Sequence, residues 1–177
     1  MYTYLGRQGS KVRILGIDPG IAIVGWGIID SKLGAFAPVA YGAIRTEANT
    51  PTETRLLDIF TELEAIIEKY KPEAFAIEEL FWNTNQKTGI IVAEARGVIL
   101  LAAQKHGLEI NEYTPLQVKQ AVVGYGRAEK NQVITMVTML LGLREPPKPD
   151  DTADALAMAI CHCHSAGSLI GSLRSRL

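Results

Sequence analysis

Four carboxylates stand at the ends of apolar segments, where a charged side chain needs a partner. Asp18 follows the run RILGI, Glu78 follows FAI, and Asp151 and Asp154 open an apolar helical stretch. A buried carboxylate is costly unless it is paired, and no basic residue adjoins any of the four in sequence. Bound cations are therefore an economical partner, and four oxygen ligands suit Mg²⁺ or Mn²⁺ better than zinc. The chemistry that fits such a site is two-metal hydrolysis of a phosphodiester.

Each acid also has a purely structural interpretation. Asp18 opens an Asp-Pro-Gly sequence typical of a turn, and Asp151 followed three positions later by Asp154 matches a helix N-cap with an acid in the first turn. Glu78 has no such use, because the apolar strand around it gains nothing from a carboxylate. The functional interpretation therefore depends on acids occurring together at three places: the two strand ends with Asp18 and Glu78, and the helix start with Asp151 and Asp154.

The secondary structure that must position these acids is predicted from apolar periodicity. Three β-rich runs over 12–18, 24–30 and 36–44 predict an antiparallel meander, with turns opening at Asp18 and over 31–34. A helix is expected next, from about Pro51 to Tyr70, with Thr50 as its N-cap. The later elements, in chain order, are a strand over 74–80, a helix over about 85–106, a strand over 108–113, a helix after the capping-box pair Thr114 and Gln117, a helix over about 128–141, and a helix from Asp151 to about His164.

This order predicts an α/β fold with a convergence of the four acids. If the strands 12–18 and 74–80 lie side by side in parallel, Asp18 and Glu78 emerge at the same end of the sheet. Asp151 and Asp154, three residues apart, share one helix face and can point to the same place.

Length and composition indicate one globular domain over 1–177, with about 1–11 and 166–177 flexible. The chain has 177 residues, of which 47% are hydrophobic, enough to bury a core. Its apolar stretches are too short to span a bilayer and its first twenty residues lack the apolar block of a secretory signal, so we expect a cytoplasmic protein without a membrane partner. Cys161 and Cys163 are expected to be reduced, and His162 and His164 to serve packing.

Charge is distributed unevenly along the chain. The net charge is −1, yet residues 47–79 hold nine acids against three bases, a local balance of −6 that leaves +5 for the remainder. Lys119, Arg127 and Lys130 lie beyond this acidic segment and suit contacts with phosphates, although ordinary solvated side chains would have the same pattern. Phe81 and Trp82 stand where a strand gives way to a polar loop, a place suited either to stacking on bases or to core packing.

The helical stretch over 85–106 is apolar nearly all round. Gly89, Ala93 and Gly97 recur along it at four-residue spacing. This stripe of small residues would let a second copy approach closely, or would face the sheet of its own chain; the residues alone leave both alternatives open.

Five motifs in order resemble the RuvC family of bacterial Holliday junction resolvases. They are GIDPG (16–20), AIEELF (76–81), QVKQAVVG (117–124), AEKNQV (128–133) and DDTADALAMAI (150–160). Any one motif is weak evidence for the family, since GIDxG also opens actin-like ATPases and sugar kinases. Five motifs in order across nearly the whole chain are specific for it.

The resemblance implies an RNase H-like fold, here a five-stranded mixed sheet of three antiparallel strands followed by parallel strands and flanked by helices. It further implies a homodimer with two Mg²⁺ ions per site, or Mn²⁺ as an alternative. The implied reaction is symmetric nicking of four-way DNA junctions, which leaves 5′-phosphate and 3′-hydroxyl ends. The implied partner is a branch-migration helicase. By match to the family's motifs, the catalytic, metal-binding acids would be Asp18, Glu78, Asp151 and Asp154, the DNA contacts Lys119 and Lys130, and the aromatic that stacks at the junction centre Phe81.

Two other functions compete with this interpretation. An actin-like phosphotransferase uses a similar strand turn but duplicates the domain, which the length of 177 residues disfavours. A non-catalytic binding module of the same fold would be expected to have lost one or more acids, whereas all four are present.

Overall fold

A five-stranded mixed sheet organises the chain, with strand order β3-β2-β1-β4-β5. The computed structural model describes residues 11–79 and 86–174. The strands are β1 (Val12–Asp18), β2 (Ile23–Lys32), β3 (Ala35–Arg45), β4 (Ala74–Glu78) and β5 (Ile110–Tyr113). β1, β2 and β3 pair antiparallel, whereas β4 pairs in parallel with both β1 and β5. This topology confirms the predicted sheet of antiparallel strands followed by parallel ones.

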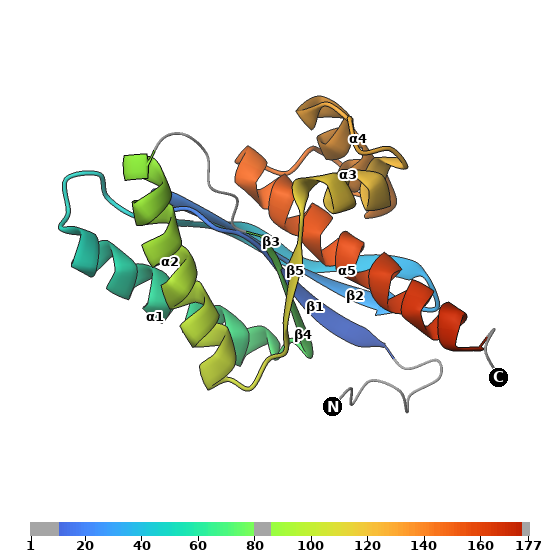
Figure 1. Cartoon of the computed structure of the whole chain (residues 1–177), viewed down its shortest axis with the longest axis horizontal. Helices are drawn as coiled ribbons and strands as arrows, with labels where there is room; N and C mark the ends of the chain where they lie inside the picture. The colour runs from blue at the N-terminus through green and yellow to red at the C-terminus, as the bar shows by residue number, and fades with distance from the viewer. Residues whose placement is uncertain (1–10, 80–85, 175–177) are drawn as a thin grey trace.

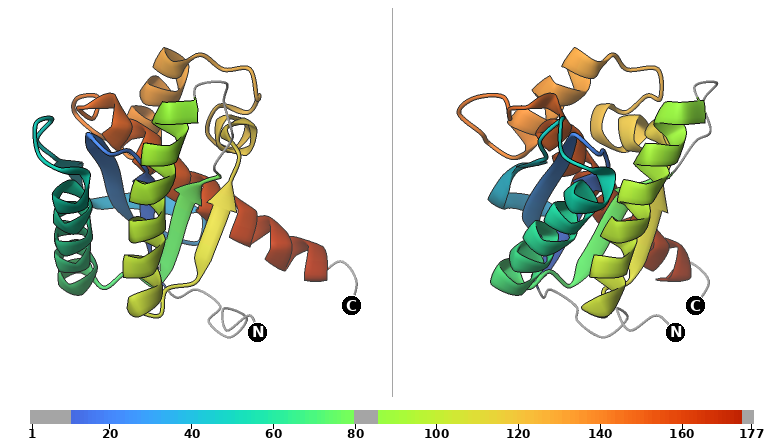
Figure 2. Two further views of the ribbon diagram at one scale, coloured as in Figure 1. Left: turned by 60° about the vertical axis from the view of Figure 1, so that its left-hand side comes forward. Right: turned by 90° about the vertical axis from the view of Figure 1, so that its left-hand side faces the viewer.

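Helices cover both faces of the sheet. Those in the described residues are α1 (Thr52–Tyr70), α2 (Gln86–Lys105), α3 (Pro115–Val123), α4 (Lys130–Leu140) and α5 (Asp150–Arg174). α1 and α2 lie on one face, and α5 lies on the other with α3 and α4 packed beside it (Figure 1; two further views in Figure 2). None of these described helices is both long and apolar enough to cross a bilayer.

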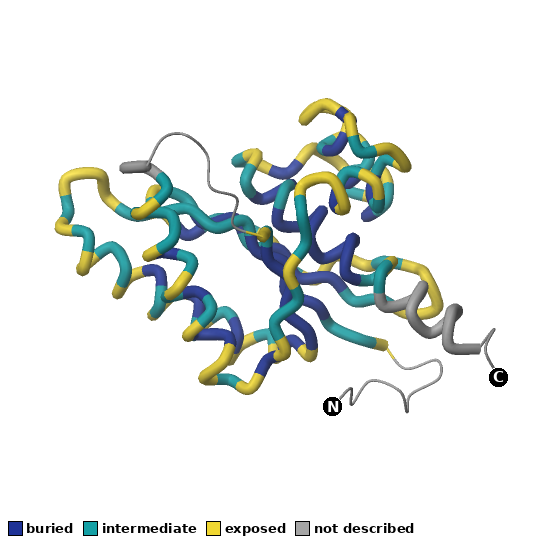
Figure 3. Tube along the Cα trace, viewed as in Figure 1, coloured by how far each residue is buried: buried dark blue, intermediate teal, exposed yellow. Residues whose placement is uncertain are grey.

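The sheet separates two hydrophobic cores, because side chains alternate between its faces along each strand. On β1, Leu15 and Ile17 belong to the core under α1 and α2, whereas Ile14 belongs to the core under α5. The first half of α5 is buried on nearly every side, from Thr152 to His162, with only Asp154 less enclosed (Figure 3). The apolar stretch that follows Asp154 is thus the buried centre of the core on this face of the sheet.

Local signals explain where several elements begin and end. The predicted capping box opens α3: the Gln117 N–H donates to Thr114 Oγ1 at 3.2 Å and the Thr114 N–H donates to Gln117 Oε1 at 2.8 Å. The turn between β2 and β3 is shorter than predicted. Leu33 and Gly34 alone form it, both with positive φ, which suits the two-residue turns that match strand twist.

Two expectations about helix ends are wrong. Thr50 does not cap α1, which begins at Thr52 after Pro51; the Thr50 N–H donates to the Glu47 carbonyl in a turn instead. The last helix also does not end at about His164, because α5 continues as a helix to Arg174. A helix that is already formed propagates with little cost, and no proline interrupts this segment. The expectation for the N-terminus falls on residues 1–10, outside the described residues.

Candidate active site

Asp18 and Glu78 end two neighbouring strands at the same edge of the sheet. β1 and β4 run in parallel, with Ile17 opposite Ile77, so the residue after each stands at the carboxyl end of its strand. Because Ile17 and Ile77 face the core under α1 and α2, alternation turns Asp18 and Glu78 to the α5 face. The predicted juxtaposition of these two acids is therefore confirmed.

Two glycines let α5 come into backbone contact with this part of the sheet. A Cβ on Gly25, the residue paired with Asp18 across β1 and β2, would stand 2.0 Å from the Asp151 carbonyl oxygen. A Cβ on Gly16 would stand 2.1 Å from the Ala155 carbonyl oxygen. The sequence held a signal for this contact, since glycine inside a strand often marks a close backbone approach.

Asp151 and Asp154 thus reach the site from the first turns of α5. The helix begins at Asp150, so the alternative in which Asp151 is an N-cap is wrong; Asp151 lies within the first turn. The backbone of Asp151 rests on Gly25 beside the end of β1, which brings this turn of α5 directly over Asp18.

The electrostatics of the site show that the four acids share one environment. The pKa of Asp18 is raised to about 8, first by burial and then by the charges of Asp154, Glu78 and Asp151, in that order. Burial also raises the pKa of Glu78, with Asp154 as the second cause, and burial raises the pKa of Asp154. Carboxylates that raise one another's pKa in this way lie close together, as two or more acids sharing a site do.

A basic partner that the sequence argument missed reaches the acids from α4. Lys130 Nζ lies 3.2 Å from Asp154 Oδ2 and 3.5 Å from Asp150 Oδ2. The absence of a basic neighbour in sequence therefore does not extend to the folded chain, in which Lys130 is a partner of Asp154. Lys130 is far from Asp154 in sequence, and only the packing of α4 against α5 brings them together. One ammonium still leaves the group of four carboxylates with a surplus of negative charge.

The donor set of this group fits a hard divalent cation. Among the described residues no group of three His, Cys, Asp or Glu side chains is already arranged to hold a metal ion. The fit rests instead on chemistry, because four carboxylates with no Cys or His among them are the oxygen ligands that Mg²⁺ and Mn²⁺ take. Burial and the mutual repulsion of the acids raise the pKa of Asp18 to about 8, and a divalent cation would offset that repulsion.

Comparison with known proteins decides the family. A family model described as crossover junction endodeoxyribonuclease RuvC matches residues 14–162, a span that contains all four acids. The chain belongs to the RuvC family. RuvC from Caldanaerobacter subterraneus subsp. tengcongensis is 58% identical over 158 residues, which cover 89% of this chain and 96% of that protein. RuvC from Heliobacterium modesticaldum is 60% identical over 152 residues, covering 86% and 94%.

Solved RuvC structures share the fold. The structure of T. thermophilus RuvC in complex with a Holliday junction substrate is similar with a TM-score of 0.84 and 35% identity, covering 88% of this chain and 94% of that one. The yeast mitochondrial Holliday junction resolvase, 15% identical with a TM-score of 0.57, supports the fold alone. These neighbours confirm the predicted RNase H-like fold class.

The residues predicted to contact DNA lie on the α5 face of this RuvC-family fold or outside the described residues. Lys119 is half-buried on α3, Arg127 is exposed between α3 and α4, and Lys130 is exposed at the start of α4. Of these three, Lys130 forms ion pairs with residues at the start of α5. Phe81 lies, with Trp82, outside the described residues.

The stripe of small residues on α2 faces away from its own sheet. A Cβ on Gly89 or on Gly97 would meet nothing within 4 Å. The opposite side of the helix is the buried one, where Ala95 and Ile99 pack on the sheet. The alternative in which the stripe packs on its own chain is therefore wrong for these two glycines.

The Cys-His-Cys-His run in the middle of α5 serves packing, as predicted. His162 is buried and its Nδ1 lies 2.8 Å from the Tyr113 hydroxyl, while burial lowers the pKa of the imidazole. His164 Nδ1 lies 2.9 Å from the Ala121 carbonyl oxygen. Cys161 and Cys163 are free thiols.

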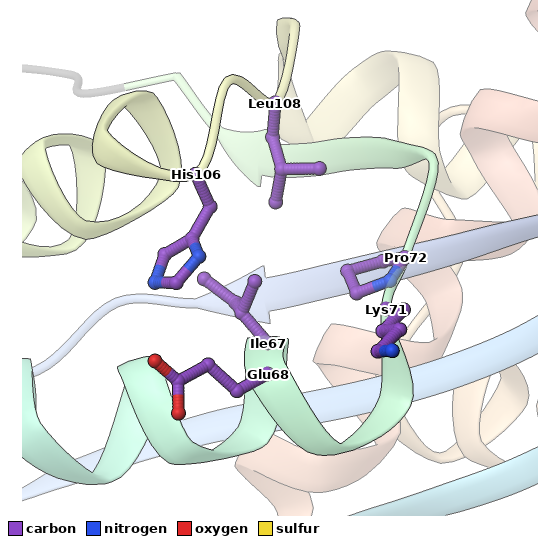
Figure 4. A pocket seen from close by; sticks show the side chains of 6 residues that line it. All are labelled: Ile67, Glu68, Lys71, Pro72, His106 and Leu108. Carbon is purple, nitrogen blue, oxygen red and sulfur yellow. The ribbon is translucent and has the colours of Figure 1, made fainter.

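A concavity at the other end of the sheet is separate from the acids. It is lined by Ile67, Glu68, Lys71, Pro72, His106 and Leu108 (Figure 4). Lys71 and Leu108 precede β4 and β5, whereas the acids stand where β1 and β4 end. This hollow therefore has no part in the carboxylate site.

Proposed function

We propose that this chain is a Mg²⁺-dependent endonuclease that resolves Holliday junctions by paired symmetric nicks. The observation that carries the proposal is the group of four carboxylates at one end of the sheet, where burial and mutual repulsion raise the pKa of Asp18 to about 8. The choice of a four-way junction as substrate is supported by T. thermophilus RuvC, whose structure was solved with a Holliday junction.

In this proposal the four acids hold two Mg²⁺ ions, with Mn²⁺ as the alternative. The ions supply charge stabilisation to the scissile phosphate and acidify the attacking water. Asp18 and Glu78 are fixed by the sheet, whereas Asp151 and Asp154 are fixed by α5, so the backbone contact between these layers sets the spacing of the ligands. A water oxygen forms a bond to phosphorus while the bond to the 3′ oxygen breaks, which leaves 5′-phosphate and 3′-hydroxyl ends.

Basic residues on α3 and α4 would hold the DNA beside the acids. Lys119, Arg127 and Lys130 lie on or between α3 and α4, which pack on the α5 face of the sheet, and cationic side chains there would contact phosphates. Phe81, which follows the strand of Glu78, would stack on a base at the junction centre, as the family resemblance implies.

A homodimer would supply the second nick. The stripe of Gly89, Ala93 and Gly97 on α2, of which Gly97 is exposed and the other two are half-buried, offers a surface on which a second copy can approach closely. Ile90 and Leu101 beside it are 53% and 60% exposed. A two-fold dimer carries two equivalent sites, which suits symmetric cutting of a two-fold substrate.

The experiment that tests this function uses a synthetic four-way junction and a duplex of matched sequence. We expect the protein with Mg²⁺ to cut the junction into two nicked linear duplexes and to leave the matched duplex intact, and we expect EDTA to stop the reaction. A junction that stays uncut with both Mg²⁺ and Mn²⁺, or one that Asp18→Asn cuts as fast as the parent protein, would rule the proposal out.

A further inference from the structure

Arg96 joins α2 to the ends of the two strands beside the site. Its guanidinium is nearly buried, with 12% of the side chain exposed, and forms an ion pair with Glu112 on β5. Its Nε also donates to the backbone carbonyl of Glu78, at 3.3 Å. α2 lies on the face of the sheet opposite the carboxylates, so Arg96 contacts the backbone that carries Glu78 from behind.

The Glu78 carbonyl lies beyond the last residue pair of β1 and β4, so β1 no longer fixes the backbone there. The parallel ladder between β1 and β4 ends at the pair Ile17 and Ile77, one residue earlier. On the other side, the Glu79 N–H donates to the Tyr113 carbonyl at 2.9 Å. Arg96 binds the carbonyl of the same peptide unit, so the peptide plane that follows Glu78 is held at both its polar atoms.

We propose that Arg96 is a positioning residue for Glu78, which acts by fixing the peptide after Glu78 and so the direction of its carboxylate toward Asp18. The inference rests on the proposed function, in which Glu78 is a metal ligand. A side chain on a loosened strand end samples more orientations, and groups that hold a metal-ligating side chain in place typically contribute about 10- to 100-fold to metal affinity or activity.

The test replaces Arg96 with glutamine in the full chain and measures three quantities. Mn²⁺ binding is titrated calorimetrically without DNA, junction binding is measured in Ca²⁺, and the single-turnover cleavage rate is followed against Mg²⁺ concentration. We expect Arg96→Gln to weaken Mn²⁺ binding by about 10-fold or more. We expect it to leave junction binding nearly unchanged, and to raise the Mg²⁺ concentration needed for half-maximal cleavage.

Arg13 offers a matched control at the other end of the sheet. Its guanidinium makes the same two kinds of contact: Nε donates to Asp30 Oδ1 at 2.8 Å and Nη1 donates to the Tyr70 carbonyl at 2.9 Å. Arg13→Gln should therefore reduce the melting temperature much as Arg96→Gln does, but should leave Mn²⁺ affinity unchanged. Equal metal affinities in the two variants would overturn the proposal.

A conservative variant keeps the proposal testable if Arg96→Gln fails to fold. Arg96→Lys retains the charge and one donor, so it should fold and recover part of the Mn²⁺ affinity. If Arg96→Lys also unfolds, or folds with the metal affinity of the parent protein, Arg96 is not a positioning residue. Failure of the proposed function has a different signature: the parent protein and Asp18→Asn would then show the same metal binding and the same lack of junction cleavage.

Discussion

Asp18 is a residue at which the needs of the site and the stability of the fold are opposed. Burial and three neighbouring carboxylates raise its pKa to about 8, so at neutral pH the unfolded chain releases the carboxyl proton that the folded chain largely keeps, which lowers the free energy of unfolding. We expect Asp18→Asn to abolish junction cleavage, leaving less than about a tenth of the parent rate, and to spare junction binding, because it removes ligand charge and no DNA contact. In EDTA the same variant should have a higher melting temperature than the parent protein.

The pH dependence of this stabilisation follows from the direction of the shift. A carboxyl group with a folded-state pKa above its ordinary value of 3.8 carries no penalty below that pH and the full penalty above about 8. The gain in melting temperature from Asp18→Asn should therefore grow from about pH 4 to pH 8. Asp58→Asn, at an exposed acid on α1, is the control and should change neither cleavage nor stability. A pH-independent gain would show that Asp18 is not held among other charges.

Lys130 is expected to affect metal binding and DNA binding in opposite directions. Its ammonium pairs with Asp154 at 3.2 Å, so it competes with a cation for that carboxylate when no DNA is present. We expect Lys130→Ala to tighten Mn²⁺ binding by up to about fivefold, the most that a pair so exposed supports. It should also weaken junction binding and reduce the salt slope by about 0.9, the value for one lost phosphate contact.

Lys119→Ala separates the two effects. Lys119 sits on α3, and none of the ion pairs of the described residues joins it to the acids, so its loss should reduce the salt slope while leaving Mn²⁺ affinity unchanged. Calorimetry and binding isotherms at several salt concentrations measure both quantities. Weaker Mn²⁺ binding in Lys130→Ala would mean that the lysine supports the metal site and does not compete for it.

At this residue scale, the four acids were predictable and their helpers were not. Charged residues in apolar strands stand out in the sequence, as Glu78 does, because nothing local explains them. The partners Lys130 and Arg96 look like any solvated cation, since what distinguishes them is a contact with Asp154 or with the Glu78 carbonyl that only the folded chain creates.

At the scale of elements, the close contact between α5 and β2 decides where two of the four acids stand. A Cβ on Gly25 would meet Asp151 backbone atoms at 2.0 and 2.3 Å, so α5 must shift to accept it. We expect Gly25→Ala to cost about 1–3 kcal/mol of stability, as overpacking does, and to reduce cleavage by more than the fraction of protein that unfolds. Cleavage rate and urea denaturation of the same preparation compare the two losses.

Gly27→Ala is the matched control on the same strand. Its Cβ would first meet the side chain of Leu156, at 2.6 Å, and a leucine side chain can change rotamer where a backbone carbonyl cannot move alone. Gly27→Ala should therefore destabilise the fold but retain cleavage in the folded fraction. Equal loss of cleavage in both variants would contradict a specific role for the contact between Gly25 and Asp151.

Element types were predictable throughout the described chain, whereas several ends were not. β1 ends at Asp18 as expected, because the Asp-Pro-Gly sequence stops the strand. The start of α1 was misplaced because Pro51 keeps a non-helical ψ of 143° and stands just outside the helix. The length of α5 was underestimated because Ser and Gly after His164 suggested a break that the helix does not make.

At the scale of the whole molecule, the two faces of the sheet differ in charge, with the excess of acids on α1. Most of the acids of segment 47–79 lie on α1, whereas Lys119, Arg127 and Lys130 lie on or between α3 and α4 across the sheet (Figure 2). Residues 114–165, which form α3, α4 and the first part of α5, hold five bases and five acids, whereas α1 holds five acids and two bases. A polyanion is therefore repelled more strongly by α1 than by the face that carries the four carboxylates.

The proposed dimer can be tested without changing the four carboxylates. Near a two-fold axis a residue faces its own copy, so an arginine placed on the α2 stripe would bring two like charges together. We expect Gly97→Arg and Ala93→Arg to sediment as monomers at micromolar concentration and to lose paired nicking. Gly97→Arg should keep the fold, because its Cβ meets nothing within 4 Å and replacing a helical glycine removes a penalty of about 0.8–1 kcal/mol.

Ala65→Arg, at an exposed alanine on α1, is the control and should remain dimeric. A monomeric parent protein, or a Gly97→Arg variant that still cuts both strands in concert, would leave the metal site standing but would remove α2 as the interface.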